Sequence, residues 1–314
     1  MVPESTRHVD PSKSAAHPIQ LPISFDWDKL NEYWELTKPR LSLLSVITAA
    51  VGYLTANPQR DATTLISLLL GTSFAAGAAG TLNQWMEREI DKRMVRTRSR
   101  PIPAGAVSPQ AALLFGLTLG TLGIGILWFN VNALAALLTF VTLFSYLAAY
   151  TPLKQKTHWC TLVGAIPGAI PPLVGWSAAT GAIDPLGWIL FGILFFWQIP
   201  HFMAIAWTYR KDYADAGFIM STAVDPSGKD AARQSMLHCI LLLIVSIIPT
   251  FVPDMTSPFY EVMATITGVY YLVKATRFWR ASNKNSPARQ LFFASILYLP
   301  LILAVLVLDR WLFV

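Results

Sequence analysis

Three oxygen-bearing side chains at a spacing of four residues are the most chemically suggestive feature of this sequence. Asn83, Glu87 and Asp91 follow the apolar stretch 65–82, and on a helix they fall within an arc of roughly 80°. Glu89 points to nearly the opposite side. An amide oxygen and two carboxylates on one face are hard ligands that suit a divalent cation such as Mg²⁺. The alternative is a helix end that is merely capped by polar residues.

A cluster of basic residues follows this face: Lys92, Arg93, Arg96, Arg98 and Arg100. The prolines of SRPIPAG (99–105) restrict the backbone after it, and a fixed loop places a guanidinium group well for phosphate. Arg96 and Arg100 are therefore the stronger phosphate candidates, although binding of anionic lipid is the alternative. Oxygen ligands beside a cationic loop predict a site for a pyrophosphate that is bridged by Mg²⁺.

The elements that position these residues are those of a membrane protein. Of the 314 residues, 54% are hydrophobic and 13% are charged, against roughly 25% charged in a soluble domain. The first span extends back through Tyr33 and Trp34 as an interfacial helix that breaks near Pro39. We expect an all-α polytopic domain over residues 29–314. Its nine predicted spans are 41–56, 64–90, 108–128, 131–149, 159–178, 184–208, 233–252, 257–278 and 288–312.

Charge alternates between the loops and gives an orientation. Basic residues gather before the first span and after the second, fourth, sixth and eighth, whereas the opposite loops hold only Arg60. Arg310 near the end is the other exception. The positive-inside rule then predicts a cytoplasmic N-terminus, an external C-terminus and an acidic face toward the cytoplasm. The net charge of +6 belongs to one membrane face, so we expect no nucleic-acid partner.

The N-terminal residues 1–28 are polar and contain no apolar stretch typical of a signal peptide. We expect a disordered cytoplasmic tail, and Glu4 and Asp10 weaken a transit-peptide reading, which favours a bacterial plasma (inner) membrane. Cys160 and Cys239 each lie inside an apolar segment, so packing roles are predicted for both.

A second acidic stretch, YRKDYADAG (209–217), ends at the same membrane face because the second and sixth spans both run inward. Asp212 follows its span as Asp91 follows the other. Lys154 and Lys156, in YTPLKQKTHW, are topological signals or a pyrophosphate-binding pair. His201 follows Pro200, which kinks a helix and frees a carbonyl. This histidine either bonds to that irregular backbone or faces a cavity as a ligand or proton carrier.

Taken together, these motifs resemble the intramembrane prenyltransferases of the UbiA type. NQWMEREIDKRMVRTRSRPIPAG (83–105) is similar to the first acidic motif of that family. Further stretches resemble its heme-farnesylating branch, the protoheme IX farnesyltransferases, and the strong similarity covers about residues 30–220. These stretches are YWELTKPRLSLL (33–44), YTPLKQKTHW (150–159), GAIPGAIPPLVGW (164–176), WQIPHFMAIAW (197–207) and YRKDYADAG.

The resemblance implies nine helices around a central cavity open to lipid, with farnesyl diphosphate and heme B as substrates. The implied reaction joins the farnesyl group to a heme vinyl group, with addition of water, to give heme O. A downstream heme A synthase is a candidate partner, alongside membrane lipid. The implied catalytic Mg²⁺ ligands are Asn83, Glu87, Asp91 and Asp212, and the implied substrate-binding residues are Arg96, Arg100, Tyr150, Lys154, Lys156, Lys211 and His201, the last as a heme contact.

One departure from the wider family concerns the second motif, where Ala216 stands in place of a second acid four residues after Asp212. The number of bound Mg²⁺ ions therefore stays open. One rival function is prenyl transfer to an aromatic quinone or chlorophyll precursor. The other is secondary transport. The charges lie at one end of the spans and not at the midplane, which argues against it.

Overall fold

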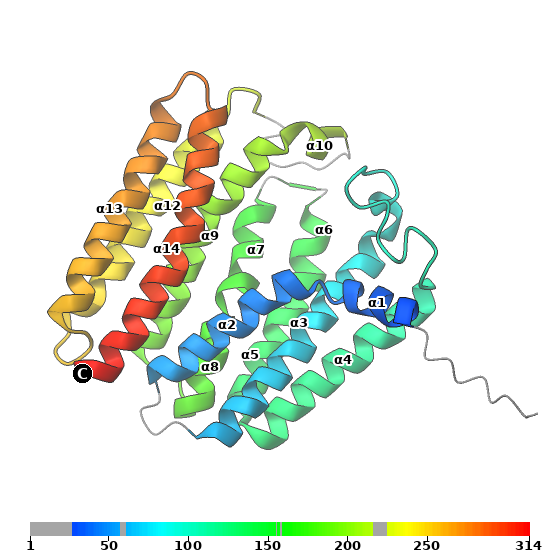
Figure 1. Ribbon diagram of the computed structural model, residues 1–314, viewed down its shortest axis with the longest axis horizontal. Coiled ribbons are helices and arrows are strands. Elements are labelled where there is room, and N and C mark those ends of the chain that lie inside the picture. Colours follow the sequence, from blue (N-terminus) through cyan, green and yellow to red (C-terminus); the bar gives the residue numbers. More distant parts are fainter. Residues whose placement is uncertain (1–26, 57–60, 155, 158, 216–224) are drawn as a thin grey trace, which may run out of the picture.

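The computed structural model describes residues 27–56, 61–154, 156–157, 159–215 and 225–314 (Figure 1). A disordered tail was expected over residues 1–28, and residues 1–26 of it lie outside the described residues. Every regular element in the described ranges is a helix, which confirms the all-α expectation. In chain order the helices are α1 (Trp27–Leu36), α2 (Pro39–Ala56), α3 (Ala62–Asp91), α4 (Pro109–Asn130), α5 (Ala133–Phe144), η2 (Ser145–Tyr150), α6 (Thr151–Leu153), α7 (Cys160–Ala169), α8 (Pro171–Thr180), α9 (Pro185–Thr208), α10 (Arg210–Asp215), α12 (Lys229–Ile247), η3 (Ile248–Phe251), α13 (Pro258–Arg280) and α14 (Asn285–Leu312).

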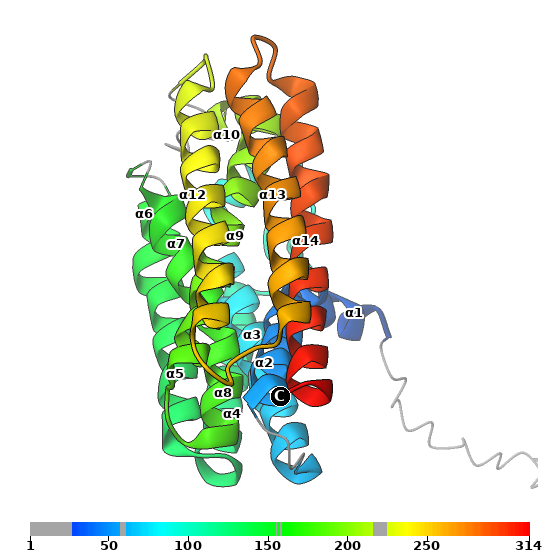
Figure 2. The ribbon, with the colours of Figure 1, turned by 90° about the vertical axis from the view of Figure 1, so that its left-hand side faces the viewer.

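Eight spans in the described residues are long and apolar enough to cross a membrane, with α5–α6, α7–α8 and α12–η3 each forming one. The predicted count of nine is not confirmed, and the difference lies in α13. That helix has 23 residues and is long enough to span, but Glu261, Lys274, Arg277 and Arg280 make it more polar. It packs between α12 and α14 (Figure 2).

The helices form two groups that meet at α2 and α8. One group contains α9, α12, α13 and α14, and the other contains α3, α4 and α5 (Figures 1 and 2). We call the end of the bundle that holds the loops 92–108 and 281–284 the basic end. At the opposite end, Trp311 Nε1 donates to Leu54 O at 2.8 Å and joins α14 to α2.

The break predicted in the first span is present, and the fifth span is interrupted as well. The interfacial helix α1 ends at Leu36, and α2 begins at Pro39 after Lys38, whose φ is +49°. Proline supplies no amide hydrogen and disfavours a helical conformation in the residue before it. In the fifth span, α7 ends at Ala169 and α8 begins at Pro171. Helix α9, by contrast, continues through Pro200.

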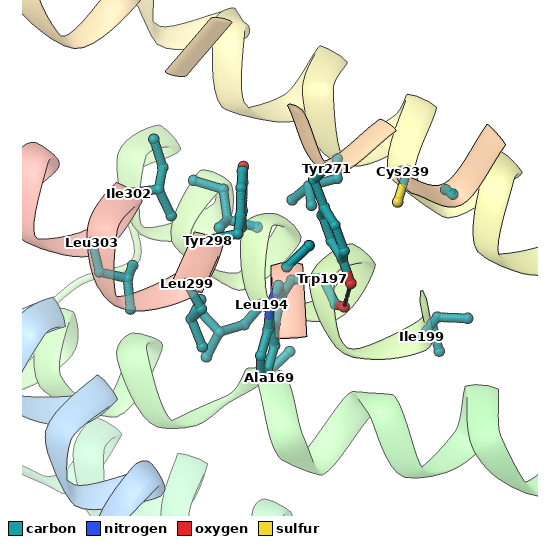
Figure 3. Packing of buried hydrophobic residues seen from close by; sticks show 14 of the residues in the cluster. Ala169, Leu194, Trp197, Ile199, Cys239, Tyr271, Tyr298, Leu299, Ile302 and Leu303 are labelled. Carbon is teal, nitrogen blue, oxygen red and sulfur yellow. Dashed lines mark hydrogen bonds between the residues drawn. The ribbon is translucent and has the colours of Figure 1, made fainter. Parts of the chain in front are cut away.

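The largest buried apolar cluster fills the space between α9, α12, α13 and α14 (Figure 3). Trp197 lies at its centre, where its Nε1 donates to Ser295 O at 2.8 Å and its own carbonyl accepts from Tyr271 Oη at 3.4 Å. Cys239 is part of this cluster, and Cys160 is buried elsewhere in the bundle. Both thiols are free, as predicted.

Helices α2 and α8 touch backbone to backbone through a reciprocal pair of glycines. A Cβ added at Gly175 would lie 1.7 Å from Ala49 O, and one added at Gly52 would lie 2.0 Å from Pro172 O. Small residues allow such close approach where lipid provides no hydrophobic driving force between helices. This contact fixes α2, and therefore the turn at Lys38, against the rest of the bundle.

Gly175→Ala is expected to destabilise the protein by about 3 kcal/mol or more, because the methyl group overlaps a backbone carbonyl that cannot move alone. Thermal unfolding in detergent measures the effect. The matched control is Gly125→Ala, where an added Cβ meets nothing within 4 Å and should leave the unfolding temperature unchanged or slightly higher. Equal unfolding temperatures for the two variants would contradict the close contact.

Candidate active site

The three predicted oxygen ligands lie on one buried face of α3. Asn83, Glu87 and Asp91 are 1%, 6% and 3% exposed, respectively. Glu89 points away, has a side chain that is 65% exposed, and pairs with Lys92. Polar groups that merely capped a helix end would remain hydrated, so burial of all three argues against that alternative. We call Asn83, Glu87 and Asp91 the acidic face.

Each residue of the acidic face is paired with its own cation, and the three cations come from different segments. Because three cations meet two carboxylates and one amide, the cluster carries an excess positive charge when all three are protonated. Such a cluster favours binding of an anion. The pairs are Lys38 Nζ with Asn83 Oδ1 at 2.6 Å, Lys154 Nζ with Glu87 Oε1 at 3.0 Å, and Arg100 Nη1 with Asp91 Oδ2 at 2.7 Å.

The surroundings of Lys38 disfavour its charged form. Burial, followed by the positive charges of Arg100 and Lys154, lowers the pKa of Lys38 from 10.5 to about 7, while Glu87 and Asp91 oppose the shift. A bound polyanion would offset that unfavourable burial of charge.

The turn between α1 and α2 places Lys38 against the acidic face, and α3 packs against that turn. Gln84 Nε2 donates to Leu36 O at 3.0 Å, and a Cβ at Gly80 would lie 2.8 Å from Thr37 O. Neighbouring residues on α3 therefore hold the end of α1 and contact Lys38, which follows it. In the sequence, Lys38 is only one of the basic residues that precede the first span. The signal for a special position is the Lys38–Pro39 step, because proline disfavours a helical conformation in the residue before it.

A π-helical turn, η2, delivers Lys154 to the acidic face. Thr151 Oγ1 donates to Tyr146 O at 2.9 Å, which supports the wide turn, and accepts from Asn83 Nδ2 at 3.1 Å. Lys154 Nζ then lies 4.6 Å from the centroid of the Tyr150 ring. Single π turns are frequent at functional sites. Neither the π turn η2 nor the role of Thr151 was predicted from the sequence.

Tyr150 is fixed on its other side by Gly164 of α7. A Cβ at position 164 would lie 2.5 Å from Tyr150 Cδ2, so the aromatic ring rests on the glycine backbone. The ring centroid of Tyr146 lies 5.4 Å from that of Tyr150. The predicted site residue Tyr150 is thus packed beside Lys154, and Tyr146 extends the aromatic surface.

The loop that follows α3 folds back onto the acidic face and also reaches α9. Thr97 Oγ1 donates to Asp91 O at 3.0 Å, which turns the chain so that Arg100 returns to the Asp91 carboxylate. Arg96 is exposed, and its guanidinium carbon lies 6.0 Å from the Tyr209 ring centroid. The two acidic stretches therefore end at the same end of the bundle, as expected.

Asp212, Lys211 and Lys156 are exposed, and among the described residues they form no hydrogen bond or salt bridge with the acidic face. No group of three His, Cys, Asp or Glu residues that could hold a metal ion occurs within the described ranges, so Asp212 does not join Glu87 and Asp91 in one cluster. Their predicted roles stay predictions. The oxygen donors that the structure does bring together, one amide and two carboxylates, fit the ligand preference of Mg²⁺.

His201 packs against α14, apart from the acidic face. Its ring is stacked between Trp197 and Phe292, with centroid distances of 5.0 and 5.1 Å. Its Nδ1 lies 2.7 Å from Ser295 Oγ, and that hydroxyl donates to Phe292 O at 2.5 Å. With the hydroxyl hydrogen directed to Phe292 O, Nδ1 would carry the imidazole hydrogen and Nε2 would keep its lone pair. The partner is a side chain, not the freed backbone that the sequence suggested.

Two groups of known proteins are similar to this chain, one in sequence and one in fold. A protein named protoheme IX farnesyltransferase from Opitutus terrae is 50% identical over 282 residues, covering 90% of this chain and 95% of that protein. One with the same name from Solibacter usitatus is 41% identical, covering 90% and 99%.

Solved structures show the same fold at low sequence identity. A digeranylgeranylglyceryl phosphate synthase has a TM-score of 0.78 and 17% identity, covering 90% of this chain and 99% of that one. A UbiA homolog from Archaeoglobus fulgidus bound to GPP and Mg²⁺ has a TM-score of 0.65 and 15% identity, covering 88% and 99%. The model of the UbiA prenyltransferase family matches residues 45–297. With most of its length matched by that family and by relatives named as prenyltransferases, the chain belongs to the UbiA prenyltransferase family.

Proposed function

We propose that this protein transfers the farnesyl group of farnesyl diphosphate to a vinyl group of heme B and so forms heme O. The single observation that carries the proposal is the buried acidic face with a separate cation on each of its three residues. Relatives named protoheme IX farnesyltransferase at 50% and 41% identity support the choice of substrates.

The cations of the cluster are suited to exchange partners when a diphosphate arrives. Lys38, Lys154 and Arg100 would turn from the acidic face to phosphate oxygens, where charge-assisted hydrogen bonds are stronger. Asn83, Glu87 and Asp91 would then be free to hold Mg²⁺, and a structural neighbour with bound GPP and Mg²⁺ supports this role. Mg²⁺ supplies positive charge that stabilises the departing diphosphate. Arg96, Lys156, Lys211 and Asp212 are further candidates at the mouth of the site.

The reaction proceeds by breaking the bond between farnesyl C1 and the diphosphate oxygen. The heme vinyl group supplies the electron pair for the new bond to C1, water adds to the resulting carbocation, and one proton is released. Tyr146 and Tyr150 lie beside Lys154, and their ring faces would stabilise the allylic cation by about 1–2 kcal/mol in a desolvated site.

The acceptor would be held on the α9 and α14 side of the bundle. His201 is partly buried between two aromatic rings and keeps the Nε2 lone pair, which is the form that ligates a metal. We propose that His201 contacts the heme and that Ser295 fixes the tautomer.

The proposed setting is the plasma membrane of a bacterium, because the named relatives are bacterial. The alternation of basic loops supports a cytoplasmic N-terminus, an external C-terminus and an active site toward the cytoplasm. Membrane lipid surrounds the helices in this setting, and heme A synthase is the proposed consumer of the product.

The test is an incubation of the purified protein with heme B, farnesyl diphosphate and Mg²⁺, followed by mass spectrometry. We expect a heme whose mass increases by a farnesyl group plus water, and we expect the product to disappear when the metal is chelated. Consumption of the diphosphate onto an aromatic quinone precursor, with heme unchanged, would refute the acceptor. No turnover by folded protein with any acceptor would refute prenyl transfer and reopen the transport alternative.

A further inference from the structure

A recess of about 680 Å³ lies at the basic end, where five helices begin or end. The end of α9 and the start of α10, the start of α12, the end of α13 and the start of α14 line it. These elements lie on the other side of the bundle from α3 and α4 (Figure 1). None of the lining residues belongs to the acidic face or to the cations paired with it.

The floor of the recess is the buried indole ring of Trp207. Its Nε1 donates to Asn285 Oδ1 at 3.0 Å, which ties α9 to α14. A Cβ at Gly228 would lie 2.4 Å from Trp207 Cζ3, so the backbone before α12 rests on the ring. The guanidinium carbon of Arg210 lies 4.2 Å from the ring centroid. The recess is therefore bounded by packed and hydrogen-bonded elements.

The lining is strongly cationic. Arg210, Lys229, Arg280 and Lys284 all contribute to it, and none of its described lining residues is a carboxylate. Arg210 uses one N–H for Trp207 O at 2.7 Å, and a guanidinium group has five. Lys229 and Arg280 are exposed and take part in no salt bridge among the described residues.

The other polar contacts around the recess include a further buried cation. They do not involve the exposed side chains of Lys229 and Arg280, which can therefore bind an anion. Lys284 donates to the carbonyls of Phe278 and Ala281, at 3.1 Å each, and so contributes buried charge to the wall. The nearby Asp225 carboxylate accepts from Ser227 N at 2.9 Å and Asp230 N at 3.0 Å, which turns it toward the start of α12. Helices α12 and α14 also begin here, and helix N-termini carry partial positive charge. Side chains of the preceding loops accept from their first amides, namely Ser227 Oγ from Lys229 N, Asp225 Oδ2 from Asp230 N and Asn283 Oδ1 from Asn285 N.

An apolar path leads from this recess along α13 toward the other end of the bundle. A second recess of about 470 Å³ shares Arg280 and Ala281 with the first and includes Val273. Exposed apolar side chains continue from it at helical spacing, namely Val273, Val269, Ile266 and Val262. A cationic hollow above an apolar stripe matches a molecule with an anionic head and an acyl chain.

We propose that the recess binds the phosphate group of an anionic phospholipid, with an acyl chain along the apolar stripe of α13. Arg280, Lys229 and Arg210 would donate to the phosphate oxygens. Basic pockets between transmembrane helices are known to accept anionic headgroups. A free phosphate presents the same chemistry, and the experiment separates the two sources.

The test compares the wild type with the double variant Arg280→Gln/Lys229→Gln, each delipidated in detergent. Native mass spectrometry measures binding of dioleoyl phosphatidylglycerol and of the zwitterionic dioleoyl phosphatidylcholine, and thermal unfolding measures stabilisation by inorganic phosphate. The matched control is Arg233→Gln/Arg289→Gln, which removes the same charge from exposed positions that line neither recess. Unliganded unfolding temperatures should agree among all three proteins.

We expect phosphatidylglycerol to bind the wild type and the control pair about 10-fold or more tightly than the double variant. If inorganic phosphate does not raise the unfolding temperature of the wild type, the site is assigned to the lipid. Stabilisation of the wild type but not of the double variant by inorganic phosphate would support the phosphate site and assign it a soluble source. Equal phosphatidylglycerol binding by the two double variants, or equal binding of the two lipids by the wild type, would overturn the proposal.

Discussion

Glu87→Gln is expected to lower kcat/KM for farnesyl transfer by about 10³-fold. The amide keeps the size of the carboxylate but removes its charge, so a metal loses an anionic ligand and the partner that Lys154 contacts at 3.0 Å loses its negative charge. Asp91→Asn should behave similarly, because it removes the carboxylate that Arg100 contacts at 2.7 Å. Steady-state kinetics with farnesyl diphosphate, over a range of Mg²⁺ concentrations, measures both losses.

Glu89→Gln is the matched control for this prediction. Glu89 lies on the same helix, two residues from both Glu87 and Asp91, but its side chain is 65% exposed and pairs with Lys92 at 3.0 Å. Its neutralisation should leave kcat/KM near the wild-type value, since exposed ion pairs contribute little. Full activity in Glu87→Gln, or an equal loss in Glu89→Gln, would show that the acidic face does not hold the metal that binds the diphosphate.

The second large effect is expected at Lys38. Lys38→Met should lower kcat/KM by about 10²-fold, chiefly through a higher KM for farnesyl diphosphate, because one charge-assisted contact to phosphate is lost. Methionine retains the unbranched stem, so the packing of the turn between α1 and α2 should survive. Kinetics at saturating and limiting diphosphate separates the two parameters.

Arg40→Gln provides the comparison for Lys38. It removes a positive charge two positions later, at an exposed site on the first turn of α2. Its kcat/KM should stay near that of the wild type. If Arg40→Gln lost as much activity as Lys38→Met, then the general charge of this membrane face, and not the contact with Asn83, would be responsible.

The acidic face was predictable because helix geometry alone relates Asn83, Glu87 and Asp91. A spacing of four residues places the three side chains on one side of any regular helix. The apolar segment before them predicts that this helix is buried in the bundle. The breaks at Pro39 and Pro171 were predictable for the same reason, since proline acts on its immediate neighbours.

The cations opposite the face were harder to assign because tertiary structure alone brings them there. Lys38 lies 45 positions from Asn83, and in the sequence it is indistinguishable from the other charges of the positive-inside pattern. The π turn η2 sets the direction of Lys154, and nothing in SYLAAY (145–150) marks an irregular turn. Asp212 illustrates the reverse case: topology brings it to the correct end, whereas α10 leaves it exposed.

The count of spans failed to be confirmed for a different reason. Helix α13 is long enough to cross a bilayer, yet its charged residues gather in its last turns, where Lys274, Arg277 and Arg280 reach the basic end. The length of α13 and its packing between α12 and α14 place this helix in the bundle. Its average hydropathy alone does not identify it as a membrane span.

The most direct measurement is a structure of the protein with Mn²⁺ in place of Mg²⁺ and with farnesyl thiolodiphosphate, an analogue that ionises slowly. Anomalous scattering locates the metal independently of the surrounding density. We expect the Mn²⁺ peak among the side-chain oxygens of Asn83, Glu87 and Asp91, with Lys38, Lys154 and Arg100 turned onto the diphosphate. A metal and diphosphate bound elsewhere, with these three cations still paired to the acidic face, would contradict the proposed site.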